Sequence, residues 1–167
     1  MKSNKLFLFI LSFLIFASCR SNETNETRQY YSNGKIKSEY LFVGDKKNRR
    51  EILYYENGNL KSMTNYINDL KEGEQLNFYE SNGKLESKLF FKNDSTNGVA
   101  YWFYKSGSMK ALRYYVNNKQ CYFGIDYWDD PAGIFKSSLH FDDKGHLYYK
   151  KNFDSTGLFI NEEGKKE

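Results

Sequence analysis

Two histidines and two aspartates around residue 142 are the side chains of this sequence best suited to chemistry. His140 and His146 flank the neighbouring residues Asp142 and Asp143. An imidazole beside a carboxylate can act as a general acid–base pair or contribute ligands to a metal ion. A metal site needs three or four ligands in a supporting geometry, whereas an Asp-Asp-Lys-Gly segment is typical of a turn. We therefore predict no catalytic residues, no metal site and no cofactor.

Other signatures of catalysis are missing from the 167 residues. The sequence shows no Ser, His and Asp arrangement, no glycine-rich phosphate loop and no Cys-x-x-Cys motif. Cys121 stands beside Tyr122 and Phe123, a setting that favours a small buried apolar side chain. The sequence therefore predicts a protein that is not an enzyme.

Aromatic side chains are the first candidates for a binding surface. Neighbouring side chains on a strand point to opposite faces, so one ring of each aromatic pair must face outward or into a second layer. We predict that Tyr101, Trp102 and Trp128 form an exposed stripe that binds glycan, peptide or lipid headgroups. The alternative is that such rings build the sheet core and cross-strand pairs. The pairs precede predicted turns and are Tyr30 and Tyr31, Tyr54 and Tyr55, Phe78 and Tyr79, Phe103 and Tyr104, and Tyr127 and Trp128.

Lysines form the second candidate binding surface. Lys37, Lys61, Lys110 and Lys136 each stand three residues after a glycine, and Glu86 interrupts the series. A row of lysines can attract anionic lipid phosphates, or it can be a solvated face that discourages edge pairing. The formal net charge is only +4, so we predict no nucleic acid partner.

A repeat of about 24 residues must position these side chains. The chain is apolar two residues after each of six glycines, mostly small four residues after and aromatic eight residues after. Asn-Gly between apolar runs is a strong hairpin signal, because glycine adopts positive φ without steric cost. Repeats of this kind usually build binding surfaces. The glycines are Gly34, Gly58, Gly83, Gly107, Gly133 and Gly145.

The repeats predict an all-β fold, a repetitive antiparallel β-hairpin meander that forms an open sheet or solenoid over residues 28–161. The residues two, four and eight positions after each glycine, here called offsets two, four and eight, are an even number of residues apart. Their side chains are therefore predicted on one face and the lysines on the other. Small residues at offset four are expected to leave room for neighbouring rings. The step from Gly133 to Gly145 is 12 residues, which predicts one strand per turn from there. A unit at Gly157 is predicted to be a degenerate end cap.

The first 27 residues predict an export signal and a tether. Lys2 and Lys5 precede an apolar run, and Ala17 and Ser18 precede Cys19. This arrangement resembles a bacterial lipoprotein signal with residues 1–18 removed and Cys19 acylated. Residues 19–27 are then a flexible polar tether and residues 162–167 a charged tail. Arg20 in place of Asp favours the outer membrane, so the predicted location is the bacterial cell envelope, lipid-anchored.

The hairpin motifs resemble the MORN-repeat variant family, including YwqK-type antitoxin components. The motif Tyr-x-Asn-Gly-x-Leu/Ile-Lys spans Tyr31–Lys37 and Tyr55–Lys61, and a related segment spans Gly73–Tyr79. The resemblance covers about residues 28 to 157. It implies a MORN-like repeat sheet, and because characterised members act mainly as scaffolds, it implies a scaffold role.

These observations predict a non-catalytic, membrane-anchored envelope lipoprotein. Its expected contacts are the membrane, through the lipid on Cys19, and a protein or glycan partner on the β-repeat surface. Two alternatives stay open. The first is an antitoxin or immunity protein that neutralises one toxin, and the second is a glycan-acting enzyme that uses His140 and Asp142.

Overall fold

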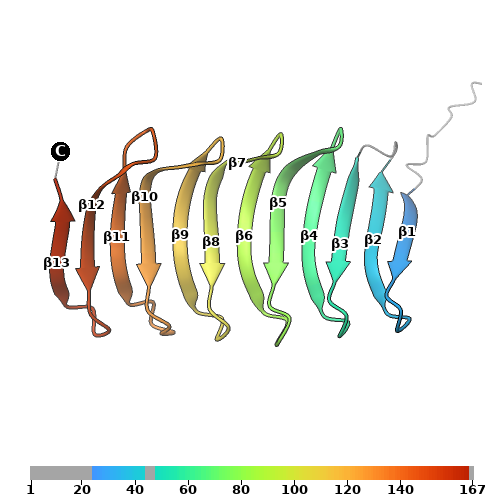
Figure 1. The fold of residues 1–167 in the computed structure, drawn as a ribbon, viewed down its shortest axis with the longest axis horizontal. Coiled ribbons are helices and arrows are strands. Elements are labelled where there is room, and N and C mark those ends of the chain that lie inside the picture. The colour runs from blue at the N-terminus through green and yellow to red at the C-terminus, as the bar shows by residue number, and fades with distance from the viewer. Residues whose placement is uncertain (1–23, 44–47, 166–167) are drawn as a thin grey trace, which may run out of the picture.

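The structure, a computed structural model, describes residues 24–43 and 48–165. All secondary structure in these ranges is strand, in one open antiparallel sheet whose strands follow chain order (Figure 1). The predicted all-β antiparallel meander is confirmed. The strands are β1 Thr24–Tyr30, β2 Ile36–Val43, β3 Arg49–Tyr54, β4 Leu60–Ile67, β5 Leu70–Phe78, β6 Leu85–Lys92, β7 Ser95–Thr96, β8 Gly98–Phe103, β9 Met109–Val116, β10 Lys119–Tyr127, β11 Phe135–Phe141, β12 Leu147–Phe153 and β13 Phe159–Gly164. The short β7 pairs with β6 and lies off the main path.

The turns lie along two opposite sides of the sheet, at the two ends of the strands, and we call these sides edges; the two edges use different turns. We call the lower edge in Figure 1 the glycine-turn edge; its turns contain Gly34, Gly58, Gly83, Gly107, Gly133 and Gly157, all with positive φ. The opposite edge, here the Asn/Asp-turn edge, carries two-residue turns whose residues both have positive φ. Two positive φ angles define the type I′ turn, which matches the twist of a hairpin. These pairs are Asn68 and Asp69, Asn93 and Asp94, and Asn117 and Asn118.

Gly145 lies at the Asn/Asp-turn edge, so the predicted shortening of the repeat to 12 residues is wrong. Gly145 connects β11 and β12, whereas Gly133 connects β10 and β11 and Gly157 connects β12 and β13. The true successor of Gly133 is therefore Gly157, 24 positions later. The sequence misled because a left-handed glycine closes a turn equally well at either edge.

A β-bulge in each hairpin at the glycine-turn edge overturns the predicted face assignment. Leu60 pairs with Tyr54, but Ser62 pairs with Leu53. Consecutive residues of β3 point to opposite faces, so Leu60 and Ser62 also lie on opposite faces despite their even spacing. The same register shift occurs beside Gln29, Asn77, Trp102, Asp126 and Asn152.

Burial is limited, because the described residues form a single layer. The buried apolar residues are Ala100, Cys121, Leu139 and Tyr149, and the buried polar residues are Ser38, Ser62, Thr64, Ser87 and Ser137. The four serines occupy offset four, and among the residues paired with them only Trp102, beside Ser87, carries a ring. The predicted burial of Cys121 is confirmed. Stability must come mainly from contacts between neighbouring hairpins.

The sheet extends beyond the predicted limits at both ends. β1 begins at Thr24, within the predicted tether, because its backbone pairs with β2 from Thr24 opposite Val43 onward. β13 runs to Gly164, within the predicted tail, because residues such as Glu163 pair with β12. The predicted signal peptide and Cys19 lie outside the described residues. Within those residues, no helix is long and apolar enough to cross a bilayer.

Candidate functional site

One face of the sheet carries most of the predicted binding residues, and we call it the lysine face. Its centre is a row of residues paired across successive strands. Small serines alternate in this row with larger side chains such as Leu53, Asn77 and Trp102. The row is Ser38, Leu53, Ser62, Asn77, Ser87, Trp102, Ala111, Asp126, Ser137 and Asn152.

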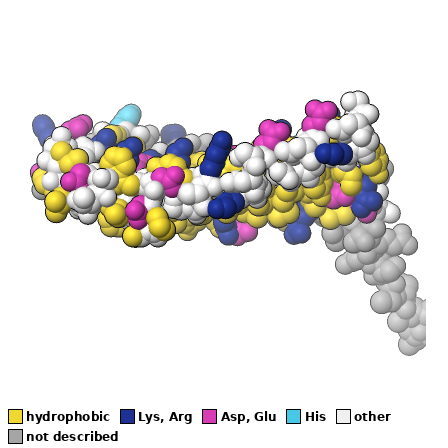
Figure 2. Space-filling model, turned by 90° about the horizontal axis from the view of Figure 1, so that it is seen from below, with side chains coloured by type: hydrophobic (Ala, Val, Ile, Leu, Met, Phe, Trp, Pro, Cys, Tyr) yellow, Lys and Arg dark blue, Asp and Glu magenta, His cyan; other side chains and the backbone are white. Residues whose placement is uncertain are grey.

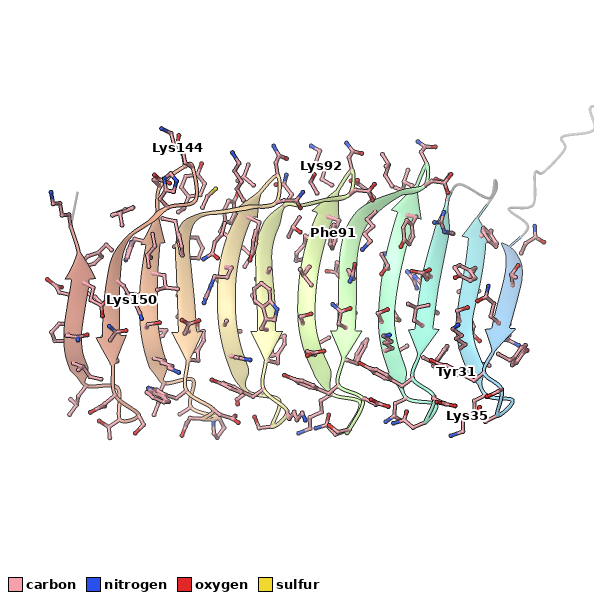
Figure 3. The ribbon with its side chains drawn as sticks, viewed as in Figure 1. Tyr31, Lys35, Phe91, Lys92, Lys144 and Lys150 are labelled. Atoms are coloured by element: carbon pink, nitrogen blue, oxygen red, sulfur yellow. The ribbon has the colours of Figure 1, made fainter. Side chains whose placement is uncertain are left out.

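Aromatic rings at the glycine turns link each repeat to the next. The Tyr31 hydroxyl donates to the Tyr54 carbonyl at 2.7 Å, and the Tyr79 hydroxyl donates to the Phe103 carbonyl at 2.6 Å. Burial raises the pKa of Tyr79 and its equivalents in the adjacent repeats. We call this series the aromatic ladder; its donors are Tyr31, Tyr55, Tyr79, Tyr104 and Trp128. Figure 3 shows Tyr31 at the glycine-turn edge.

The predicted lysines lie over the rings of the aromatic ladder. The Nζ of Lys61 is 5.6 Å from the centre of the Tyr55 ring, and that of Lys136 is 4.8 Å from the Trp128 ring. Lys37 and Lys110 lie over Tyr31 and Tyr104 in the same way, and Lys105 takes this place over Tyr79. All four predicted lysines are exposed. The prediction that they oppose the serine positions is wrong, because each sits beside the bulge that shifts its strand.

Two shallow hollows adjoin the aromatic ladder on the lysine face. The larger, about 570 Å³, lies between the turns after β3 and β5, and the smaller, about 300 Å³, reaches Trp102. Tyr55 and Glu86 line both. The larger is also lined by Asn57, Tyr79, Glu80, Ser81 and Lys105, and the smaller by Lys61, Ser62, Asn77, Ser87 and Trp102.

The lining side chains can recognise a polar ligand with apolar patches. Lys61 offers a cation, Glu86 an anion, and Trp102 a large flat surface. Asn77 Nδ2 donates to Ser87 Oγ at 2.9 Å, which fixes the amide between its neighbours. Mixed charges, hydroxyls and rings suit sugar hydroxyls or a peptide backbone.

The three predicted aromatic residues do not form one stripe. Trp102 and Trp128 belong to the lysine face, but Tyr101 pairs with Leu112 and therefore points to the opposite face. All three are half-buried. The Trp128 indole also donates to the Phe153 carbonyl at 3.3 Å, so part of its polar edge serves the fold.

The opposite face carries two apolar rows that spacing alone did not reveal, and we call it the apolar face. The bulges bring the offset-two residue of each glycine turn at the glycine-turn edge across the sheet to this side, whereas Leu147, after Gly145, pairs with Phe141 near the other edge. Row one is Tyr30, Ile36, Tyr54, Leu60, Phe78, Leu85, Phe103, Met109, Tyr127, Phe135, Phe153 and Phe159. Row two is Ile52, Met63, Leu76, Tyr101, Leu112 and Ile125, with Lys88 in its middle. Seen from the glycine-turn edge, hydrophobic side chains extend along the molecule (Figure 2).

Tyr122 has an unusual backbone conformation that the sequence pattern did not lead us to expect. Its φ is 64°, and it stands where the earlier repeats have Gly73 and Gly98. The alignment of the repeats contains the signal, because Gln120 and Lys71 hold equivalent positions and Tyr122 and Gly73 each stand two residues after them. Tyr122 is 55% exposed, and its ring centre lies 5.5 Å from that of Tyr114.

Gly124, which the sequence aligns with Gly73 and Gly98, has a different role from theirs. A Cβ added there would lie 2.8 Å from Arg113 Cδ. The glycine therefore makes room for Arg113, whose guanidinium is paired with Asp126. In this repeat the positive φ falls on Tyr122, and the glycine supports a side chain instead.

The structure does not pair His140 with Asp142. The His140 ring lies 5.3 Å from the ring of Tyr149. Asp142 accepts from the His146 backbone N–H at 2.7 Å and contacts its Nδ1 at 3.0 Å, and the backbone bond from His146 lowers the pKa of Asp142. Within residues 24–43 and 48–165, no three His, Cys, Asp or Glu side chains are grouped to hold a metal ion.

Sequence comparison matches the first four hairpins to a known family model. The model is described as MORN repeat variant, and the matched segments are residues 23–43, 50–68, 71–93 and 96–117. Each segment corresponds to one hairpin at the glycine-turn edge. The strands β10 to β13 continue the same architecture beyond the matched segments. No curated protein matches the chain.

Proposed function

Because the chain belongs to the MORN repeat variant family, we propose that it is a non-catalytic binding protein whose lysine face holds a protein or glycan partner. Repeats of this family indicate a binding or scaffold role. At five successive glycine turns the open sheet presents an aromatic ring with a lysine over it. An extended partner could therefore meet similar contacts along the array.

The hollow that joins Lys61 to Trp102 carries the proposal. It places a cation, a carboxylate and an indole around amide and hydroxyl groups, and it adjoins the larger hollow through Tyr55 and Glu86. Opposite charges side by side favour a neutral polar ligand over a strongly charged one. The rings supply apolar contact area for a sugar ring or an extended peptide.

We propose further that the protein is a lipid-anchored envelope protein, with the acyl chains on Cys19 and the outer membrane as its site. The support is the sequence of residues 1–20. Four residues, Arg20 to Glu23, separate Cys19 from β1. Even fully extended, they and Thr24 reach about 17 Å. An anchor at Cys19 would therefore hold the sheet close to the bilayer by its first strand.

Capture of the partner in cells tests the binding proposal. The full-length chain is crosslinked in its own cells, and the captured material is compared for Trp102→Ala and Tyr101→Ala. These neighbours lie on opposite faces of β8, so they are a matched pair. We expect Trp102→Ala to lose the partner and Tyr101→Ala to keep it. Loss with Tyr101→Ala alone would contradict a binding site on the lysine face.

Two further readouts separate the remaining parts of the proposal. Protease treatment of the captured material distinguishes a protein partner from a glycan. Cys19→Ser should move the chain from the membrane fraction to the soluble fraction. If the Cys19→Ser chain stays in the membrane fraction, the anchoring proposal fails, whatever the outcome at Trp102.

A further inference from the structure

We propose that two copies of the chain pair through their apolar faces, as a twofold symmetric dimer. Within the described residues no second layer covers this face. Several of its side chains are largely exposed, including Tyr30 at 57%, Phe135 at 50% and Phe159 at 55%. Extended apolar patches on a soluble surface usually mark an interaction site.

The apolar face is large enough for a stable dimer. Row one crosses all 12 strands of the main path. At about 4.8 Å per strand it is about 53 Å long, and two rows of side chains on one face are about 13 Å wide. The product is about 700 Å² per copy, close to the ~800 Å² that each partner of a stable complex typically buries.

The pattern of the apolar face is complementary to itself about an axis parallel to the strands, between β6 and β8. Six strands of the main path lie on each side of this axis. A second copy rotated about it, with the sheets about 10 Å apart, brings Leu76 over Leu112. It also brings Leu85 over Phe103. Lys88, in the middle of row two, pairs with Glu74 within its own copy and meets the Tyr101 ring of the other copy, where a cation–π contact can add to that ion pair.

Charges at the two ends of the sheet agree with the same axis. At one end, Arg28 on β1 and Glu39 on β2 lie in register with row two. At the other end, Lys151 on β12 and Glu162 on β13 continue that row. The twofold places Glu39 opposite Lys151 and Arg28 opposite Glu162. A shift by one strand would bring Arg28 opposite Lys151, so these charges also select the register.

A second copy explains the apolar face better than a lipid bilayer. A bilayer surface would favour lysines around the apolar rows, whereas this face carries charges of both signs: Glu39 pairs with Arg28 and Glu74 with Lys88 within one copy, and Glu26 and Glu162 also lie on this face. Anionic headgroups would compete with these carboxylates for the basic side chains. In the dimer, the two row-two carboxylates, Glu39 and Glu162, each face a basic side chain of the other copy.

The molar mass of the full-length chain in detergent solution tests the dimer. We compare the unchanged chain with Leu76→Glu, which places a carboxylate against Leu112, and with Leu89→Glu on the lysine face. Leu89 pairs with Gln75, and both leucines are half-buried on adjacent strands. We expect a dimer for the unchanged chain and for Leu89→Glu. For Leu76→Glu we expect dimerisation at least about 100-fold weaker.

A crosslinking measurement locates the axis and does not depend on Leu76. In the dimer, the two Lys88 positions lie about 11 Å apart across the interface, whereas the two Lys151 positions lie more than ~40 Å apart. A short bismaleimide should therefore crosslink the Lys88→Cys chain to itself and leave Lys151→Cys uncrosslinked. Both variants keep the apolar side chains of rows one and two, and Lys88→Cys removes a partly exposed ion pair with Glu74.

Any of three results would overturn the proposal. The first is a monomeric full-length chain at tens of micromolar concentration. The second is a dimer unaffected by Leu76→Glu or crosslinked through Lys151→Cys. The third is binding of phosphatidylethanolamine–phosphatidylglycerol vesicles that Leu76→Glu abolishes and Leu89→Glu keeps, because the apolar face would then be a membrane surface. Partner capture that depends on Trp102 is a separate outcome and stands or falls independently.

Discussion

Adjacent repeats are joined by different kinds of contact at the two edges of the sheet. At the Asn/Asp-turn edge, backbone groups meet directly: the Asp94 N–H donates to the Lys71 carbonyl at 3.1 Å, and Asp94 Oδ1 accepts from the Lys71 N–H at 2.7 Å. At the glycine-turn edge, long side chains span the gap, as Tyr79 does to Phe103. The hollows lie at this second edge. The hollows therefore form where long side chains, rather than short bonds between turns, connect the repeats.

The largest difference between the edges should appear when a connecting side chain is removed. Tyr79→Ala deletes a half-buried ring, its hydroxyl bond and the contact with Lys105. We expect a loss of about 2 kcal/mol, roughly half the cost at a fully buried aromatic site. Asp94→Gly at the other edge removes the carboxylate but keeps a residue that tolerates φ of 63°. It leaves the backbone bond to Lys71 in place and should cost about 1 kcal/mol. Urea unfolding of both variants measures the two losses, and a larger loss for Asp94→Gly would contradict the expected difference between the edges.

Turn residues should respond next most strongly. Gly107 has φ of 101°, and an added Cβ would find ordinary contacts with Lys84 at 3.7 Å. Gly107→Ala should therefore cost about 1–2 kcal/mol through backbone strain alone. Asn93, with φ of 48°, occupies a type I′ position where glycine is also preferred, so Asn93→Gly should change stability by less than about 0.5 kcal/mol. Equal melting temperatures for the two variants would show that the edges do not differ in this way.

Removal of a single ladder hydroxyl isolates the hydrogen bond from the ring. Tyr79→Phe keeps the ring but leaves the Phe103 carbonyl without its donor. We expect a loss of about 1 kcal/mol, measured by urea unfolding beside Tyr79→Ala. The matched control is Tyr101→Phe, for which the described contacts include no ladder bond. If Tyr79→Phe and Tyr101→Phe unfold at the same urea concentration, the ladder hydrogen bond adds no stability.

Tyr122 differs from the other residues at positive φ near the Asn/Asp-turn edge, because its side chain is bulky. Tyr122→Gly restores the residue type of Gly73 and Gly98. The change removes backbone strain and loses ring contact with Tyr114, and we expect a net gain of about 0.5–1 kcal/mol. A rise in melting temperature would confirm the strain. A fall would mean that the contact with Tyr114 outweighs it.

Acid should weaken one contact at the glycine-turn edge, with the smallest expected effect. Hydrogen bonds from Ser106 and Ser108 lower the pKa of Asp129, joining two successive turns. Because the folded-state pKa lies below the ordinary value of 3.8, the Asp129 carboxylate stabilises the folded chain at pH values above 3.8. This stabilisation is lost as the pH falls through the folded-state pKa. Asp129→Asn should therefore show a flatter decline of melting temperature below pH 4. An unchanged decline would remove Asp129 from the contacts between turns.

The sequence predicted the strands and most turns because each repeat carries its own local signals. Asn-Gly turns and alternating side chains are read within a few residues. It could not predict the faces, because one bulge beside Lys61 inverts parity without leaving a mark in the spacing. It could not assign Gly145 to an edge, because only the pairing of β11 with β12 decides that.

Some residues of the candidate binding site on the lysine face were predicted and others were not. Lys61 and Trp102 were both named, and the structure brings them to one hollow. Glu86 was regarded as an interruption of the lysine row, yet it lines both hollows. The sequence correctly placed the offset-two residues opposite the lysines but wrongly grouped them with the serines, because the bulge that separates Leu60 from Ser62 leaves no mark in the spacing. Row two was not predicted.

The aromatic ladder also limits how such a chain can change its length during evolution. Each ring donates to a carbonyl one repeat ahead, and the series ends at the sixth glycine turn, where Asp154 replaces the ring. Duplication or deletion of a whole unit of 24 to 26 residues keeps every donor opposite an acceptor. A change of 12 residues would move the following rings to the other edge, where Gly145 already lies. Gene variants of this protein that persist should therefore differ by whole repeats.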